Sequence, residues 1–219
     1  MVKIQINSQG KAYYTSAGKV LLAPEGGSSG KYSLLQRVSD DNNNEIGTVS
    51  GFFTDANDIE YAVVCLDAQY RLDSGQWSSS TGVVTNLPYY QNQTVWSSTE
   101  TATFNTQKIL DWCDTNSYTS SACSHCRSKS FTIDDTLYYG QLPNIVELVD
   151  IFRRRIGINS ADTSASGYSS LIIPTLTRCW SSTQAFDYIC WTIYESGDVQ
   201  AYYKDEFSFV IPVLEIPNQ

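Results

Sequence analysis

The sequence predicts an α+β fold, on three observations. β-prone segments occupy residues 32–67, two helical segments follow them, and a hairpin with a closing strand ends the chain. This order of strands, helices and strands is typical of an α+β domain, because α/β proteins alternate the two kinds of element. The 219 residues suffice for one large domain, or for one domain with an added arm.

Residues 1–40 are predicted to form a short β-rich arm and linker, and residues 41–219 the main domain. Asn7–Ala12 is echoed by Thr15–Val20, and each copy places a Ser-x-Gly-Lys turn before a short β-prone run. Pro24–Gly30 is rich in Gly and Ser, which predicts a flexible linker. An arm of this size suits attachment or oligomerisation. The alternative is that it forms the first hairpin of the main domain.

Three strands are predicted at the start of the main body, because aromatic and β-branched residues dominate Tyr32–Val38, Thr48–Thr54 and Glu60–Asp67. Polar tracts separate these segments. Gly75–Gln93 is rich in Ser, Thr, Gly and Asn, and it is predicted to be a long surface loop.

Two helices are predicted in the middle of the chain. The first follows Asn105 as its N-cap. The second begins at Pro143–Asn144, where Glu147 completes a capping box, and three arginines favour its negative end before Gly157 stops it. Their apolar positions are Ile109, Trp112 and Cys113 in the first helix, and Ile145, Leu148, Val149, Phe152 and Ile156 in the second.

The C-terminal part is predicted to be a hairpin and a final strand. Ile189–Tyr194 and Asp198–Tyr203 flank Ser196–Gly197, which has the composition of a tight turn. Phe207–Val213 then closes the domain, and Pro212 suits an edge or final strand.

Composition favours a binding surface and argues against two classes of partner. The chain has 15 Tyr, 8 Phe and 5 Trp, and tyrosine is a large, stiff contact residue, although a Tyr-rich β protein has the same composition. With a net charge of −9 and only 14 Lys and Arg, the chain gains no counterion-release affinity for nucleic acid. No stretch has the length of a membrane-spanning helix, and Met1–Ile6 lacks the apolar run of a signal peptide.

The C-terminal motifs carry a family resemblance. They are Cys179–Gln184 (CWSSTQ), Trp191, Gly197–Val199, Lys204 and Val210–Val213. This series resembles the C-terminal half of C-type-lectin-like domains found in phage tropism determinants and in variable proteins of diversity-generating retroelements. The two upstream helices look like the helical part of the same lineage, so the similarity covers residues 47–213. A second Trp-Ser-Ser-Thr at Trp96–Thr99 shows that the tetrapeptide alone has little specificity.

The resemblance implies a C-type-lectin-like fold, with two helices and a small antiparallel sheet, and it implies a ligand face. In that family the residues between Trp-Ser-Ser-Thr and the next Trp face solvent, together with those after the following hairpin. Alternatively, alternate members such as Ile189, Cys190 and Phe207 face the core of the hairpin. The implied ligand-binding residues are Phe186, Asp187, Tyr188, Ile189, Tyr202, Tyr203, Asp205 and Phe207, beside Ala185 and Glu206.

The function implied by the resemblance is adhesion. A phage virion protein at a fibre tip would bind a host-cell receptor, glycan or protein, as a homotrimer, and its arm would contact other virion proteins. Such a protein is made in the host cytoplasm and released by lysis, so it needs no signal peptide. Two alternatives remain, namely a structural virion subunit that contacts another phage protein and an enzyme on the same scaffold.

Codon chemistry adds an independent observation on diversification. Mutagenesis of adenines in AAC codons cannot produce Lys, Gln, Glu, Trp or Met. Residues 185–190 contain only permitted types, whereas Gln184, Trp191 and Lys204 are of forbidden types. Glu206 is also forbidden and would be a fixed neighbour. The pattern fits a diversified ligand face.

Catalytic or metal chemistry is not indicated, and no cofactor is expected. The six cysteines are interpreted mainly as small apolar core residues. His125 is the only histidine, and with Cys113, Cys123 and Cys126 it offers a zinc site as an alternative. Formylglycine-generating enzymes of the lectin-like lineage use cysteines, and Cys179 and Cys190 flank the ligand face, so oxidation chemistry is a second alternative. Glu215–Asn218 interrupts the Glu-Pro-Asn signature of calcium-dependent lectins and is placed at a frayed terminus.

Overall fold

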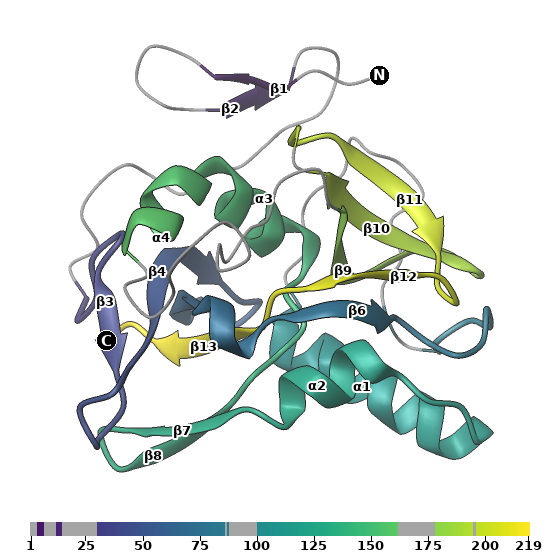
Figure 1. Cartoon of the computed structure of the whole chain (residues 1–219), viewed down its shortest axis with the longest axis horizontal. Coiled ribbons are helices and arrows are strands. Elements are labelled where there is room, and N and C mark those ends of the chain that lie inside the picture. Colours follow the sequence, from purple (N-terminus) through teal and green to yellow (C-terminus); the bar gives the residue numbers. More distant parts are fainter. Residues whose placement is uncertain are drawn as a thin grey trace.

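The protein is an α+β fold with several antiparallel sheets and few helices, which confirms the predicted class (Figure 1). The structure is a computed structural model. It describes residues 4–6, 12–14, 30–85, 87, 100–161, 178–194 and 196–219. Over these residues, no helix has both the length and the apolar character needed to cross a membrane.

Only two strands of the predicted arm are described. β1 (Ile4–Ile6) and β2 (Ala12–Tyr14) pair antiparallel. The rest of the predicted repeat and nearly all of the predicted linker lie outside the described residues. From Gly30 onward the chain packs into the main body, where Tyr32 is buried and its backbone N–H donates to Asn218 Oδ1 at 2.8 Å. The main body therefore includes residues before 41.

One four-stranded antiparallel sheet has the order β13-β5-β4-β3. Its strands are β3 (Arg37–Ser39), β4 (Glu45–Thr54), β5 (Glu60–Leu66) and β13 (Val213–Pro217). The strands predicted at 48–54 and 60–67 are confirmed. The strand predicted at Tyr32–Val38 is wrong over most of its length, because Leu35 adopts a left-handed φ of 61° in a turn and pairing starts only at Arg37.

The second sheet has the order β11-β10-β9-β12-β6 and holds the predicted hairpin. Its strands are β6 (Leu72–Gln76), β9 (Arg178–Phe186), β10 (Ile189–Tyr194), β11 (Val199–Tyr203) and β12 (Phe207–Val210). Gly197 has a φ of 83° at the predicted turn between β10 and β11. The predicted loop at Gly75–Gln93 starts two residues too early, because β6 extends to Gln76, which pairs with Phe207. Residues 86 and 88–93 of this loop lie outside the described residues.

The closing strand predicted at Phe207–Val213 is divided between the two sheets. β12 pairs with β9 and β6, whereas β13 pairs with β5. Pro212 has no N–H to donate to a ladder, and it stands where the chain passes from one sheet to the other. Its carbonyl oxygen accepts from Leu66 N at 3.0 Å, so the crossing is itself hydrogen-bonded.

Four helices are described, namely α1 (Ala102–Asn116), α2 (Ser121–Arg127), α3 (Ile145–Arg153) and α4 (Arg155–Ala161). The N-cap of α1 is Thr101, whose hydroxyl accepts from Phe104 N at 3.0 Å. The prediction of Asn105 as N-cap is wrong, because Asn105 is buried inside the helix and donates to Ser182 Oγ at 3.2 Å. The capping box of Asn144 and Glu147 is confirmed.

The second predicted helix is two helices in the structure. α3 ends at Arg153 and α4 continues through Gly157, which the sequence analysis took as the stop. A Cβ on Gly157 would lie 2.9 Å from Leu35 Cδ1, so the glycine allows close packing. Ile156 is 79% exposed and does not belong to the buried stripe.

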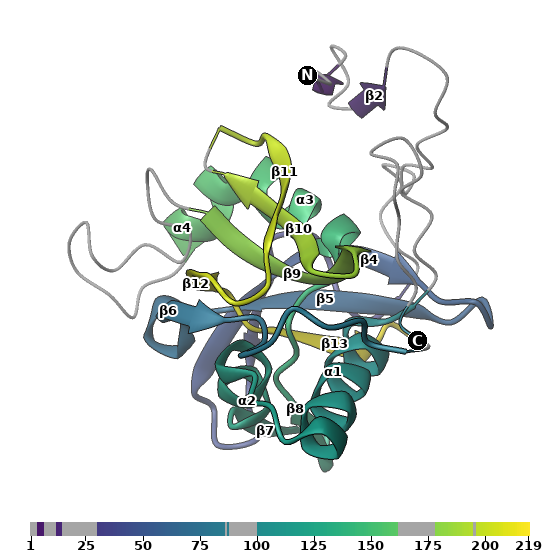
Figure 2. The same cartoon turned by 90° about the vertical axis from the view of Figure 1, so that its right-hand side faces the viewer.

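The helices lie on different sides of the sheets. α1 and α2 lie below β6 in both views, whereas β10 and β11 lie above it (Figures 1 and 2). α3 packs against β4, β9 and β10. A further hairpin of β7 (Ser130–Ile133) and β8 (Thr136–Tyr139) turns at Asp134 and Asp135, which both have positive φ, as a two-residue hairpin turn requires. The sequence analysis predicted neither these two strands nor α2.

Candidate ligand-binding surface

Two neighbouring turns at one end of the second sheet carry the predicted ligand-binding residues. The first turn joins β9 to β10, and the second joins β11 to β12. Ile189 is paired with both Phe186 and Tyr203, so the two turns lie at the same end of the sheet. Lys204 N donates to Tyr188 O at 3.2 Å and joins the turns directly. We call residues Phe186–Ile189 and Tyr202–Phe207 the tip.

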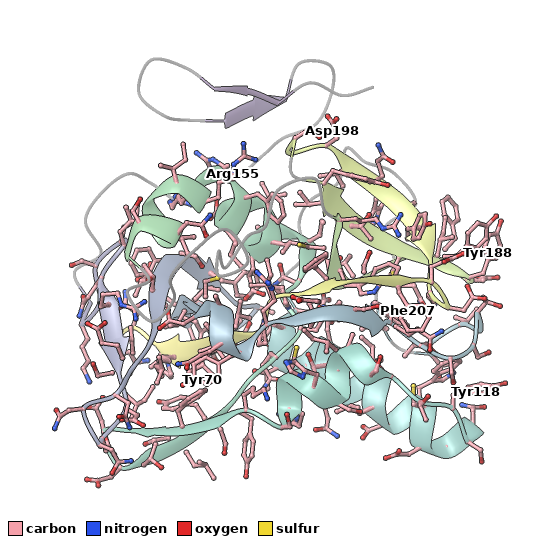
Figure 3. All side chains as sticks on the ribbon, in the orientation of Figure 1. Tyr70, Tyr118, Arg155, Tyr188, Asp198 and Phe207 are labelled. Atoms are coloured by element: carbon pink, nitrogen blue, oxygen red, sulfur yellow. The ribbon has the colours of Figure 1, made fainter. Side chains whose placement is uncertain are left out.

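The tip presents aromatic side chains to solvent. Tyr188 and Tyr203 are 50% and 53% exposed, and their rings stack with centroids 5.9 Å apart and planes at 21°. Phe207 is 55% exposed and Phe186 37%. Tyr188 lies at the edge of the molecule in the view of Figure 3. Large apolar groups gathered at the surface mark interaction sites more often than isolated ones do.

Strand alternation decides which predicted residues reach this surface. Ala185 and Cys190 are fully buried, so they face the core. Ile189 is half-buried and packs on the core, as the core-facing alternative predicts. Phe207 is exposed, as the solvent-facing alternative predicts. Tyr202 is half-buried: the guanidinium carbon of Arg178 lies 3.0 Å from its ring centroid. The side chains of Asp187, Asp205 and Glu206 are exposed.

Lys204 is the one residue of the tip that is fully buried. Its ammonium donates to Gly82 O at 3.0 Å, to Asp187 O at 2.8 Å and to Gln184 Oε1, and it lies 4.7 Å from the Trp77 ring centroid. An ammonium has three N–H donors, and each has an acceptor here. Burial lowers the pKa of Lys204 to about 8. The side chain therefore ties the β9–β10 turn to β9 itself and to the segment after β6.

The Trp-Ser-Ser-Thr segment, Trp180–Thr183, is buried and connects several elements of the core. Trp180 Nε1 donates to Gly75 O at 2.7 Å, and Ser181 Oγ donates to Trp191 O at 2.7 Å. Thr183 Oγ1 accepts from Ile145 N at 2.9 Å, at the start of α3. These bonds connect β9 to β6, β10 and α3, so the segment holds the frame that carries the tip. Sequence reasoning singled out these residues as a family signature and did not foresee this role.

The cysteines and the histidine do not assemble a reactive centre in the described part of the chain. All six cysteines are buried, and burial raises the pKa of Cys123 and Cys179 to about 12 and that of Cys190 well above its ordinary value. His125 Nε2 lies 2.7 Å from the backbone oxygen of Tyr70, so this ring nitrogen is hydrogen-bonded to the main chain. Among the described residues, no three His, Cys, Asp or Glu side chains converge as metal ligands.

The C-terminus is not frayed, contrary to the sequence analysis. Glu215 is 7% exposed, and its carboxylate accepts from Ala102 N at 2.7 Å and Thr103 N at 2.9 Å, at the start of α1. A second buried carboxyl, Glu147, lies at the start of α3. Burial and the neighbouring Glu215 raise the pKa of Glu147 well above its usual range. The pair stabilises two helix starts and is remote from the tip.

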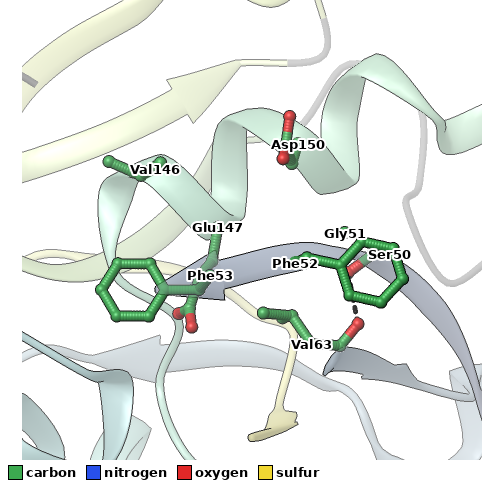
Figure 4. A pocket seen from close by; sticks show the side chains of 8 residues that line it. All are labelled: Ser50, Gly51, Phe52, Phe53, Val63, Val146, Glu147 and Asp150. Carbon is green, nitrogen blue, oxygen red and sulfur yellow. Dashed lines mark hydrogen bonds between the residues drawn. The ribbon is translucent and has the colours of Figure 1, made fainter. Parts of the chain in front are cut away.

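A small pocket lies between α3 and β4 (Figure 4). Phe52, Phe53, Val146, Glu147 and Asp150 are among the residues that line it. Its free volume of about 10 Å³ holds about one water molecule. Ligand pockets have volumes of about 300 Å³ or more, so this cavity does not suit a substrate.

The tip thus carries exposed aromatic and acidic side chains on two hydrogen-bonded turns, and its geometry suits contact with a ligand surface. It contains all eight predicted site residues, of which six are exposed, whereas Ile189 and Tyr202 are half-buried. Comparison of the chain with protein-family models, with curated protein sequences and with solved structures found no match.

Proposed function

We propose that this protein is a phage virion surface protein of the receptor-binding kind, which adheres to a host-cell surface through the tip. The observation that carries the proposal is the exposed Tyr188–Tyr203 stack on a turn anchored by buried Lys204. Full burial of an aromatic side chain removes about 150–250 Å² from solvent, and about half of that area is still exposed on Tyr188 and on Tyr203. Anchoring lowers the conformational entropy that the tip loses on binding, so more of the contact energy is retained as affinity.

A C-type-lectin-like fold is the second part of the proposal. It is supported by two helices beside an antiparallel sheet, by Trp-Ser-Ser-Thr on the buried strand β9, and by the position of the tip after that motif. In such domains the strands are a scaffold, and the turns after this motif meet the ligand. The adhesion acts outside the cell after lysis, with the N-terminal arm on other virion proteins and three copies giving multivalent attachment.

Diversification of the ligand face fits only part of the segment between Gln184 and Trp191. Ala185 and Cys190 are fully buried, and changes of volume at such positions destabilise a packed core. A diversified set would therefore be restricted to Phe186–Ile189 and to the exposed residues of the second turn.

Binding of fluorescent protein to candidate host cells tests the proposal. Wild type is compared with the double variant Tyr188→Ala/Tyr203→Ala, and with Phe104→Ala/Tyr139→Ala as a matched control. The control residues are 40% and 44% exposed on α1 and β8, away from the tip. We expect wild type and the control to bind, and the tip variant to lose binding while it stays folded. Equal binding by all three proteins would refute the proposal.

A further inference from the structure

The exposed charged residues of the tip itself are all acidic, although the half-buried Arg178 donates to Phe207 O at 3.2 Å beside them. Within Phe186–Ile189 and Tyr202–Phe207 there are three carboxylates, on Asp187, Asp205 and Glu206, and all three side chains are exposed. The one cation in these segments, Lys204, is fully buried and holds backbone and amide oxygens. Among the described residues, these three carboxylates take part in none of the ion pairs. The same two turns therefore carry exposed negative charge and the exposed rings of Tyr188 and Tyr203.

Within the same sheet, two tyrosine rings already contact a cation, the guanidinium of Arg178. The Arg178 guanidinium carbon lies 3.0 Å from the ring centroid of Tyr202 and 5.8 Å from that of Tyr194. Its Nε donates to Ser208 Oγ at 2.7 Å, so the group is held by both π faces and oxygen. The stacked pair of Tyr188 and Tyr203 offers similar π faces with carboxylates beside them, but its rings are half exposed.

We infer that the tip recognises a basic segment of a protein on the host surface, whose Lys or Arg side chains lie on the rings of Tyr188 and Tyr203 between the three carboxylates. The inference rests on the proposed function and names the chemistry of its ligand. Charge complementarity carries it: aromatic faces and carboxylates both attract organic cations, and the net charge of −9 steers basic partners toward the chain. A turn that projects outward suits another protein's surface.

The probe is a fluorescein-labelled nonalysine peptide, tested by fluorescence anisotropy against the full chain at about 20 mM and 150 mM salt. We expect binding that weakens with salt, and about tenfold or greater loss in the tip variant Asp187→Asn/Asp205→Asn/Glu206→Gln. The matched control is Asp58→Asn/Asp135→Asn/Asp198→Asn, which changes the net charge equally. Its residues are exposed and lie outside the tip, Asp198 at the other end of the β10–β11 hairpin. The control should bind within about twofold of wild type.

Three results would overturn the inference. Equal losses in the tip and control variants would mean general attraction by net charge. Equal binding of the fully Nε-acetylated peptide would mean that the cation is irrelevant. Tighter binding of a chitosan hexamer than of nonalysine would assign the site to an aminoglycan. The proposed function fails separately, in the cell assay. If cells bind the Asp187→Asn/Asp205→Asn/Glu206→Gln variant but not the Tyr188→Ala/Tyr203→Ala variant, the proposed adhesion is supported and the recognition of a cation is refuted.

Discussion

The ammonium of Lys204 donates to the carbonyl oxygen of Asp187 at 2.8 Å, from a fully buried position beneath an exposed turn. This contact couples the core to the surface that we propose binds ligand. Without it, a turn of a few residues would hold two aromatic side chains only by its local hydrogen bonds. The buried cation has no carboxylate among its three acceptors, so its bonds to oxygen dipoles must compensate its desolvation.

Replacing Lys204 is expected to destabilise the protein and loosen the tip. Lys204→Met keeps most of the volume but removes the ammonium donor from Gly82 O and Asp187 O, whereas Gln184 Oε1 still accepts from Val84 N at 3.1 Å. Each unsatisfied buried acceptor costs about 1–3 kcal/mol, offset in part because the charge is no longer buried. We expect a net loss of about 2–4 kcal/mol in urea unfolding, with faster amide exchange at Lys204 and in the β9–β10 turn.

Lys31→Met is the matched control for this prediction. Lys31 is exposed and pairs with exposed Asp134, so its loss should cost less than about 1 kcal/mol. If Lys204→Met and Lys31→Met lower the free energy of unfolding by the same amount, the buried ammonium of Lys204 stabilises the protein no more than a surface ammonium does.

Sequence patterns predicted the fold where the local signal and the tertiary contacts agree. The capping box at Asn144, the strands β4 and β5 with their aromatic and β-branched residues, and the Ser196–Gly197 turn are all of this kind. α2 and the β7–β8 hairpin have seven and four residues per element, which is too short for periodicity to identify. Thr101 and Asn105 are both good N-cap types, and burial of Asn105 against Ser182 decides between them.

The sequence named the residues of the candidate site but not the contacts that support them. The structure places these residues in two neighbouring turns and shows which of them are exposed, while their role in ligand binding stays a prediction. From the sequence, Lys204 was noted as one of the residues that carry the resemblance and as a type that AAC mutagenesis cannot give, with no structural role assigned to it. Its role depends on Gly82, Gln184 and Asp187, which meet only in the folded chain. Such non-local contacts have no sequence period, so no pattern can reveal them.

Stability is expected to fall as pH rises above about 4.5, because of Glu147. Its folded pKa lies well above the ordinary value of 4.5 through burial and the nearby Glu215, so the folded state binds the proton more tightly than the unfolded state. Its stabilisation is therefore complete below 4.5 and is lost as pH rises through the folded pKa. Glu147→Gln keeps a neutral group that accepts from Asn144 N, and it should flatten the slope of unfolding free energy against pH.

Urea unfolding at pH 5, 6, 7 and 8 measures this slope. The exposed Glu206→Gln variant, which loses one carboxylate at the surface, should retain the wild-type slope. A Glu147→Gln protein that keeps the full slope would assign the pH dependence to other groups.

The cysteines are expected to be unreactive in the folded protein. All six are buried, and burial raises the pKa of Cys179 to about 12, so at pH 8 it is a protonated and inaccessible thiol. Iodoacetamide followed by intact mass spectrometry should add no label to the native chain and six labels in denaturant. Rapid native labelling of Cys190 would contradict this expectation and would favour the enzymatic alternative.

Tyr202 is expected to act as a structural residue, in contrast to its neighbour Tyr203. It packs under the Arg178 guanidinium and lies 6.1 Å from the Trp180 ring centroid, so Tyr202→Ala should cost about 2 kcal/mol of stability. Tyr202→Phe keeps the ring and should change both stability and cell binding little. Tyr203→Ala, at a 53% exposed position, should change stability by less than about 0.5 kcal/mol yet weaken cell binding. Loss of cell binding in a fully stable Tyr202→Phe protein would show instead that this phenol contacts the ligand directly.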